Sequence, residues 1–383
     1  MIFLLCLAAA CTPKANVSKA LPSRDPLPPQ TPPVASVSAW VRANDPRIVI
    51  MGRTDTSSPE VVRFGYPGVT LFVQFEGSEL ALRAASTNGK SRLGLNLDGK
   101  MLEPVDVSVG EAELMLVHDL VPGRHRLAIS HLTETWIGVV SIFGISAGGG
   151  ELLQADPLPE RRLLFIGDSV TCGEAVDRGK DCNKDASWWN ASASYGALAA
   201  RAFDANFQLV CYGGRGLVRD WQGKSDVENA PKFFELAIAE QSPRVPWDHA
   251  RFSPNAVVVS LGTNDFSLGI GPLPDEQGFL TAYVAFLKEI RAQYPQAFIV
   301  LTEGAIVNDQ ADPARPQKTV LRSYIRKTIE LLGDERVMAW NAEHRPGDAC
   351  DAHPTRAQHA LMAQELVRLL SAKLGWEPTA AAM

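Results

Sequence analysis

The sequence predicts two folded regions, an all-β domain followed by an α/β domain with a parallel sheet. In residues 38–150, short runs rich in β-branched and aromatic residues alternate with turn signals, and no long helical periodicity interrupts them. From about residue 161, unbroken apolar runs alternate with helical segments, which is typical of a parallel sheet covered by helices. The 383 residues suffice for two or three domains of roughly 150 residues each.

The first region has the pattern of a β-sandwich, for which we expect a jelly-roll arrangement. One of its apolar runs is followed by Asp98-Gly99, a strong hairpin signal. The glycines at 148–150 then mark the end of the domain. Strands are expected at residues 69–75, 93–97, 113–117 and 124–130.

The second region, residues 160–376, has the strand–helix alternation of a flavodoxin-like sheet. Sheets of this type place their functional sites at the carboxyl ends of the strands. We expect strands at residues 163–166, 207–211, 256–260, 297–302 and 337–340, and helices at 192–203, 276–294, 317–332 and 355–374.

The N-terminus has the pattern of an export signal. Residues 1–11 form an apolar run that is too short to span a membrane and ends in Leu-Ala-Ala-Ala-Cys. This ending resembles a bacterial lipobox, in which Cys11 is lipidated. Residues 12–37 are rich in proline and predict an extended linker. We therefore expect an exported lipoprotein at the periplasmic or outer-membrane face, or else a secreted protein.

Export changes the interpretation of the cysteines, because disulfides persist in oxidising compartments. Once Cys6 is removed and Cys11 is lipidated, four remain, and four cysteines allow three pairings. Cys172 and Cys182 lie ten residues apart in a polar stretch, which favours a local bridge between them. The alternative is four buried thiols. The spacings resemble no structural zinc site, so no metal is expected.

Composition excludes several functional classes. Hydrophobic residues make up 46% and charged residues 21%, as in ordinary globular proteins, so a wholly disordered chain or a polytopic membrane protein is excluded. The net charge of −6, without a basic run, argues against nucleic acid as a partner, because such binding depends on cations that neutralise phosphates.

Four polar or glycine-rich clusters follow the predicted strands or precede the last helix, and their residue types suit acyl transfer. Ser169 follows the first strand and can act as a nucleophile, with His353 as the base. Gly214 follows the second strand and Asn264 the third. The backbone N–H groups of Ser169 and Gly214 and the amide of Asn264 could stabilise an oxyanion. Each motif alone is weak evidence for catalysis. The prediction of a catalytic site rests on the order of the motifs along the sheet.

Asp351 precedes His353 by two residues. In an extended segment, residues i and i+2 project to the same side, so the carboxylate could orient the imidazole. The other six histidines lack such a setting.

These blocks resemble the four signature blocks of SGNH (GDSL-type) hydrolases, and in particular carbohydrate esterase family 2, which pairs an N-terminal jelly roll with an SGNH domain. The resemblance covers roughly residues 47–374. It implies deacetylation of acetylated plant polysaccharides, such as xylan, glucomannan or hexose O-6 acetates, without a cofactor. It also implies the roles of nucleophile, oxyanion donors and base for the residues named above.

The sequence departs from most SGNH enzymes at one position. These enzymes place the triad aspartate three residues before the histidine, where this chain has Cys350. Asp351 resembles the arrangement in some members of family 2, whereas other members use a Ser–His dyad.

Aromatic residues near the blocks are candidates for stacking on a sugar, although packing within the protein is the alternative for each. We expect a monomeric, exported O-acetyl esterase, held at a membrane only through its lipid. The rival hypotheses are a GDSL-type lipase or lysophospholipase on the same catalytic set and, from another class, a non-catalytic carbohydrate-binding protein. The aromatic candidates are Trp188, Trp189 and Trp221.

Overall fold

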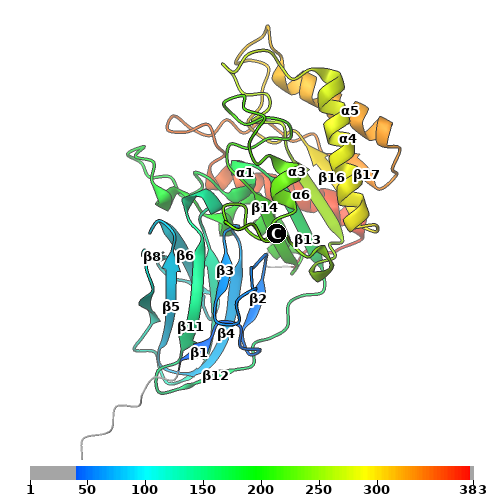
Figure 1. Ribbon diagram of the computed structural model, residues 1–383. Coiled ribbons are helices and arrows are strands. Elements are labelled where there is room, and N and C mark those ends of the chain that lie inside the picture. The colour runs from blue at the N-terminus through cyan, green and yellow to red at the C-terminus, as the bar shows by residue number, and fades with distance from the viewer. Residues whose placement is uncertain (1–39, 380–383) are drawn as a thin grey trace, which may run out of the picture. The chain divides into compact units, whose positions relative to one another are not determined.

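The computed structural model describes residues 40–379 (Figure 1). The predicted export signal, Cys11 and the proline-rich linker lie outside the described residues. Within residues 40–379, no helix has the length and apolar character needed to cross a membrane.

The first region consists of two antiparallel sheets. In the first sheet, the order is β1-β11-β5-β9, and β3 also pairs with β11. In the second, the order is β12-β4-β10-β6-β7, with β2 on β4 and β8 on β6. The strands of the first sheet are β1 (Val41–Arg42), β3 (Val62–Phe64), β5 (Leu80–Ser86), β9 (Ala112–Val117) and β11 (Val140–Ser146). Those of the second are β2 (Val49–Met51), β4 (Thr70–Gly77), β6 (Ser91–Leu97), β7 (Lys100–Met101), β8 (Val105–Val107), β10 (Gly123–His131) and β12 (Glu151–Leu153).

Alternating side chains join these two sheets into one core. Along β10, Leu127, Ile129 and His131 are buried, while the residues between them are more exposed. The apolar side chains of both sheets pack into a single cluster. A sheet with one buried face has this period of two. The β-sandwich is thus observed as two antiparallel sheets, and its jelly-roll topology stays a prediction.

Two local features of this region compare directly with the sequence. The predicted Asp98-Gly99 hairpin is confirmed: both residues have positive φ, and they join β6 to β7. Both central residues of a type I′ turn require positive φ. The expected boundary at residue 150 falls too early, because β12 pairs with β4 and keeps the chain in the second sheet to Leu153.

The second region is built on a parallel sheet, as predicted (Figure 1), and its strands lie in the order β14-β13-β15-β16-β17. Along β13, Leu164 and Ile166 pack into the cluster on one face, and Leu163 and Phe165 into the cluster on the other. Both faces are therefore buried, which explains the unbroken apolar strands. The strands are β13 (Arg162–Gly167), β14 (Asn206–Cys211), β15 (Ala256–Ser260), β16 (Phe298–Thr302) and β17 (Val337–Ala339).

Helices cover the two faces of this sheet. One face packs against α3, α4 and α5, and the other against α2 and α6. The expected helix at residues 317–332 has the observed bounds of α5, whereas the short helices α1 and α3 carried no periodic signal. The α-helices are α1 (Ser169–Cys172), α2 (Tyr195–Ala202), α3 (Ala230–Phe234), α4 (Glu276–Gln293), α5 (Gln317–Leu332) and α6 (Arg356–Leu374). The short 3-10 helices are η1 (Thr135–Ile137), η2 (Ala186–Trp188), η3 (Ala191–Ala193) and η4 (His249–Arg251).

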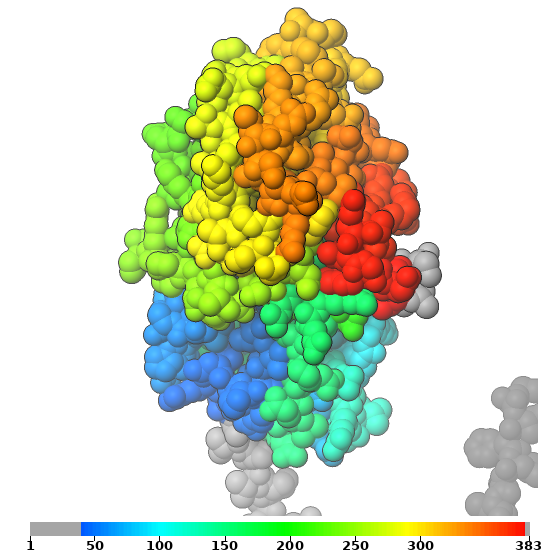
Figure 2. Space-filling view, turned by 90° about the vertical axis from the view of Figure 1, so that its right-hand side faces the viewer, coloured from blue at the N-terminus to red at the C-terminus, as the bar shows by residue number. Residues whose placement is uncertain are grey.

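The β region packs directly against the α/β region. The buried guanidinium of Arg53 donates to Gln208 Oε1 and to the carbonyl oxygen of Leu236. The Tyr66 hydroxyl donates to the Phe233 carbonyl oxygen at 2.6 Å. Figure 2 shows the β region, which begins in blue, in contact with the α/β region, which runs from green to red. The two regions thus share an interface, and side chains of the β region can reach the edge of the parallel sheet.

Candidate active site

Ser169 lies at the carboxyl end of β13, on a sharp turn into α1. Asp168 caps this helix by accepting the Val170 N–H at 3.1 Å. A Cβ atom at Gly167 would lie 2.2 Å from Thr171 Oγ1, so the turn requires glycine at that position. The local sequence Gly-Asp-Ser therefore places the serine at the start of the helix, on the edge where the strands end.

His353 meets Ser169 from the other end of the chain. Its Nε2 lies 2.8 Å from Ser169 Oγ, and its Nδ1 lies 2.5 Å from Asp351 Oδ1. Because the carboxylate can only accept, Nδ1 carries the proton and Nε2 is free to accept the serine hydroxyl. The structure thus joins the three predicted residues in one chain of hydrogen bonds, from Ser169 through His353 to Asp351, which is the arrangement that an activated nucleophile requires.

Two charged residues that the sequence analysis missed complete this cluster. Lys184 Nζ lies 2.9 Å from Asp351 Oδ2 and also pairs with Glu174, whose Oε2 is 3.6 Å from His353 Nε2. Both come from the insertion after α1, and no spacing in the sequence linked that insertion to residue 353. Glu174, Asp351 and His353 are close enough together to hold a metal ion, but their ligand atoms already face Lys184 and Ser169.

The charges in this cluster shift the pKa values in opposite directions. Burial acts to raise the pKa of Asp351, but the hydrogen bond and charge of His353, with Lys184, hold it well below its usual range. Burial acts to lower the pKa of His353, but its bond to Asp351 and the charges of Glu174 and Asp351 raise it overall. Asp351 is therefore ionised at neutral pH, and the imidazolium that forms when His353 takes a proton is favoured.

The two other predicted residues follow the neighbouring strands. Gly167 of β13 pairs with Cys211 of β14 and with Ser260 of β15, so the loops that carry Gly214 and Asn264 start at the same edge as Ser169. Gly214 has φ +77°, and within residues 40–379 its N–H has no acceptor. Asn264 Nδ2 donates one hydrogen to the Arg215 carbonyl oxygen at 2.8 Å, which leaves its second hydrogen available.

Asp265, which directly follows Asn264, holds the loop that follows Gly214. Its fully buried carboxylate accepts backbone N–H groups of Leu217, Val218 and Arg219 at 2.7–3.1 Å. Burial raises the pKa of Asp265, and these three hydrogen bonds act against that rise. The aspartate of the Gly-Thr-Asn-Asp motif thus shapes the loop after Gly214.

The predicted local disulfide between Cys172 and Cys182 is wrong. The bridges are Cys172–Cys211 and Cys182–Cys350, with Cα–Cα distances of 5.6 and 5.1 Å. Cys172 ends α1 beside the end of β14, whereas Cys182 lies in the insertion that reaches the loop of Asp351. The pairing follows from which cysteines the parallel strands and this insertion bring close together in space. The short separation of ten residues between Cys172 and Cys182 does not decide it.

Two of the three candidate tryptophans have no face available to a sugar. Trp188 and Trp189 are only 2% and 4% exposed and pack with Ile137 and Ala175. The bulky indoles fill the gap between the insertion and the β region. Both tryptophans therefore pack within the protein, which was the alternative to stacking on a sugar.

Two other indoles near these residues are exposed. Trp221 is 56% exposed, and a Cβ atom at Gly214 would lie 2.6 Å from its Cδ1, so it lies beside the predicted oxyanion donor. Trp136, from η1 of the β region, is 47% exposed and makes an edge contact with Trp189. The sequence analysis missed Trp136, because nothing in its neighbourhood linked it to the catalytic motifs.

Comparisons with known proteins agree with this geometry. Residues 50–157 match the family model described as carbohydrate esterase 2 N-terminal, and residues 165–361 match the GDSL-like lipase/acylhydrolase family. An acetylxylan esterase / glucomannan deacetylase of Cellvibrio japonicus is 40% identical over 346 residues, which cover 90% of this chain and 94% of that protein. The cellulase/esterase CelE of Acetivibrio thermocellus is 30% identical over 344 residues, 87% of this chain and 40% of that protein.

Solved structures show the same likeness. A family two carbohydrate esterase from Cellvibrio japonicus is 41% identical with a TM-score of 0.83, covering 88% of this chain and 98% of that one. A family two carbohydrate esterase from Clostridium thermocellum, in complex with cellohexaose, is 29% identical with a TM-score of 0.79, covering 86% and 99% of the two chains.

Fold, site and comparisons together define a carboxylic ester hydrolase of the SGNH (GDSL-type) class. Within this class, the chain belongs to carbohydrate esterase family 2, which confirms the resemblance seen in the sequence.

Proposed function

We propose that this protein is an exported O-acetyl esterase that removes acetyl groups from acetylated polysaccharides such as xylan or glucomannan. The single observation that carries the proposal is the aligned set Ser169, His353 and Asp351 at the edge of the parallel sheet. The name of the 40% identical relative, acetylxylan esterase / glucomannan deacetylase, supports the substrate class.

In the proposed mechanism, Ser169 Oγ attacks the carbonyl carbon of the acetyl ester while His353 Nε2 takes the hydroxyl proton. The imidazolium is stabilised by the Asp351 carboxylate on Nδ1. His353 then gives its proton to the departing sugar oxygen, leaving an acetyl–Ser169 ester. Water, deprotonated by His353, attacks this ester and releases acetate, with the proton returning to Ser169. The proposal needs no metal or cofactor.

The tetrahedral intermediates carry negative charge on the former carbonyl oxygen. We assign its stabilisation to the backbone N–H groups of Ser169 and Gly214 and to the second hydrogen of the Asn264 amide. The Gly214 N–H, which has no acceptor in the described part of the chain, supports this assignment. So does Asn264, because the bond of its amide to the Arg215 carbonyl fixes the orientation of the side chain.

We further propose that Trp221 and Trp136 contact the sugar. Both indoles are exposed, Trp221 next to Gly214 and Trp136 in contact with Trp189, and an indole face stacks favourably on the apolar face of a pyranose. Trp136 comes from the β region, so that region would contribute to the substrate site as well as to packing.

Export and lipidation at Cys11 remain part of the proposal. The two disulfides among the described cysteines support an oxidising compartment. Expression of the full chain and of Cys11→Ser in a bacterial host, followed by membrane fractionation, tests the anchor. Unchanged membrane association of Cys11→Ser would contradict it. Size-exclusion chromatography with light scattering tests the expected monomer.

The central experiment compares three substrates side by side. Acetate release from acetylated xylan and acetylated glucomannan should be rapid, and acyl release from a phospholipid should be negligible. Ser169→Ala should fold normally and lose nearly all of the activity. A preference for the phospholipid would instead establish the lipase or lysophospholipase alternative. Sugar binding without hydrolysis by the wild type would indicate a binding protein.

A further inference from the structure

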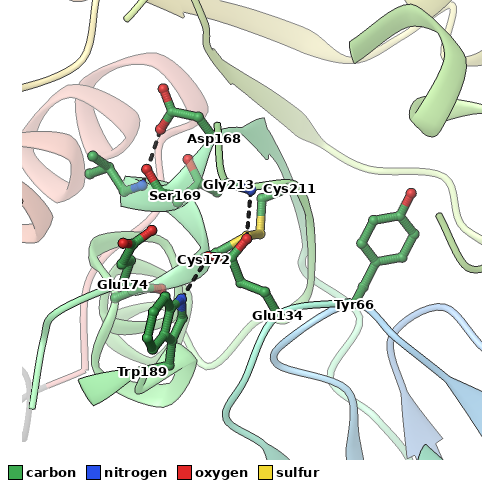
Figure 3. The surroundings of a disulfide bond; sticks show 12 residues. Tyr66, Glu134, Asp168, Ser169, Cys172, Glu174, Trp189, Cys211 and Gly213 are labelled. Carbon is green, nitrogen blue, oxygen red and sulfur yellow. Dashed lines mark hydrogen bonds between the residues drawn. A yellow bond between two sulfur atoms is a disulfide. The ribbon is translucent and has the colours of Figure 1, made fainter. Parts of the chain in front are cut away.

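A carboxylate from the β region reaches the catalytic edge of the other region. Glu134 lies between β10 and η1, and its side chain is completely buried. Its Oε2 accepts the Gly213 N–H at 2.5 Å, and its Oε1 accepts the Trp189 indole N–H at 2.6 Å (Figure 3). Glu134 thus connects the β region to the residue directly before Gly214.

The contact with Gly213 is close and specific. A Cβ atom at Gly213 would lie 2.7 and 2.9 Å from the two carboxylate oxygens, so only glycine leaves room for the carboxylate. The turn is closed by the hydrogen bond from the Arg215 N–H to the Tyr212 carbonyl at 3.3 Å. A second hydrogen bond, from the Trp221 N–H to the Gly214 carbonyl at 2.9 Å, also holds the turn.

These bonds leave one backbone donor of the turn free. The N–H of Gly213 is bound by Glu134, and the carbonyl of Gly214 is bound by Trp221. Within residues 40–379, the N–H of Gly214 has no acceptor. The Gly214 N–H lies in the peptide plane between Gly213 and Gly214. Glu134 holds the plane before it, through the Gly213 N–H, and the bonds of the Gly214 carbonyl and the Arg215 N–H hold the plane after it, so together these contacts restrain the direction in which the Gly214 N–H points.

We propose that Glu134 is a positioning residue for catalysis, and that its carboxylate holds the Gly213–Gly214 turn so that the Gly214 N–H points at the oxyanion. The inference rests on the proposed function, because it requires Gly214 to be an oxyanion donor. It gives the β region a role in the chemical step as well as in packing.

The electrostatics make a purely structural role for this carboxylate costly. Burial, together with repulsion from Glu174, raises the pKa of Glu134 above its ordinary range, while the bonds from Trp189 and Gly213 act against that rise and favour the ionised form. A buried carboxyl is expensive unless its oxygens are satisfied, and here both accept an N–H. Buried carboxyl groups with a perturbed pKa cluster at functional sites.

The test uses Glu134→Gln in the full chain, with an aryl acetate as substrate. The amide keeps the volume but offers only one acceptor oxygen, so one of the two N–H donors must face an NH₂ group. Loss of an oxyanion donor costs about 10²–10³ in kcat, so we expect displacement of the turn to cost about 10- to 100-fold in kcat, with a smaller change in KM.

Tyr66→Phe is the matched control. It removes another buried hydrogen bond that links the β region to the α/β region, but this bond goes to the Phe233 carbonyl of α3 and not to the turn. Its kcat should stay within about twofold of wild type, while its melting temperature falls by a similar amount to that of Glu134→Gln. Active-site titration with an organophosphonate gives the fraction of competent enzyme, so kcat is expressed per active site.

A kcat per active site within twofold of wild type in Glu134→Gln would overturn the proposal. If Glu134→Gln does not fold, Gly213→Ala serves instead, because its Cβ must push the turn away from the carboxylate; unchanged kcat in that variant would equally overturn it. The proposed function fails separately, if Ser169→Ala keeps its activity. An inactive Ser169→Ala beside a fully active Glu134→Gln removes only this inference.

Discussion

The carboxylate of Asp351 folds back onto the residue two positions ahead of it. The same oxygen, Oδ1, accepts the His353 ring Nδ1–H at 2.5 Å and the His353 backbone N–H at 2.8 Å. The loop that carries both residues is clamped by Arg178, which donates to the carbonyl oxygens of Asp351 and His353. A carboxylate held by so many contacts determines both the tautomer and the orientation of the ring.

Asp351→Ala should therefore lose at least roughly tenfold in kcat, with ~10⁴ as a ceiling. The variant should fold, because Arg178 still binds the loop carbonyls. Steady-state kinetics with an aryl acetate, together with the circular dichroism spectrum, provide the check. Turnover within twofold of wild type in a folded variant would mean that another group orients His353, as in a dyad.

The pH profile should report the raised pKa of His353. The base must be neutral to accept a proton, so kcat/KM falls as the pH drops through this pKa. Because Asp351 and Glu174 raise the pKa of His353 above its ordinary 6.5, the acid limb should have an apparent pKa above 6.5. Asp351→Asn removes one of these charges and should move the limb to lower pH. An unmoved limb would show that His353 is not the titrating base.

Asn264→Ala should reduce kcat by about 10²–10³, because it removes one hydrogen bond to the oxyanion. KM should change less, since the donor acts mainly in the transition state. The substitution also removes the hydrogen bond to the Arg215 carbonyl, so the melting temperature of the variant should be measured to detect any loss of stability. A change confined to KM would reassign Asn264 to substrate binding.

Opening the Cys182–Cys350 bridge should impair catalysis as well as stability. Cys350 directly precedes Asp351, and Lys184, two residues from Cys182, pairs with the Asp351 carboxylate. A bridge that closes so long a loop contributes about 2–5 kcal/mol to the free energy of unfolding. The Cys182→Ser/Cys350→Ser variant should also lose roughly tenfold in kcat, because small displacements of a catalytic group are costly. Wild-type kcat in the double variant would show that the bridge does not position Asp351.

The features that could be predicted from the sequence are those encoded locally. The Asp98-Gly99 hairpin and the helix at residues 317–332 follow from turn chemistry and from periodicity within one segment. The order of the catalytic motifs also follows, because parallel strands bring their carboxyl ends to one edge. The sequence thus sufficed to place Ser169 and His353 in one candidate site.

The tertiary structure alone decided which distant residues meet. Cys172 pairs with a cysteine 39 residues away, and Cys182 with one 168 residues away, although the two lie only ten residues apart. Trp189 is buried, and its indole binds Glu134 of the other region. The insertion and the β-region loop that make these contacts have no hydrophobic period, so their positions depend on packing between regions. Only the folded chain therefore reveals that the β region reaches the turn that carries Gly214.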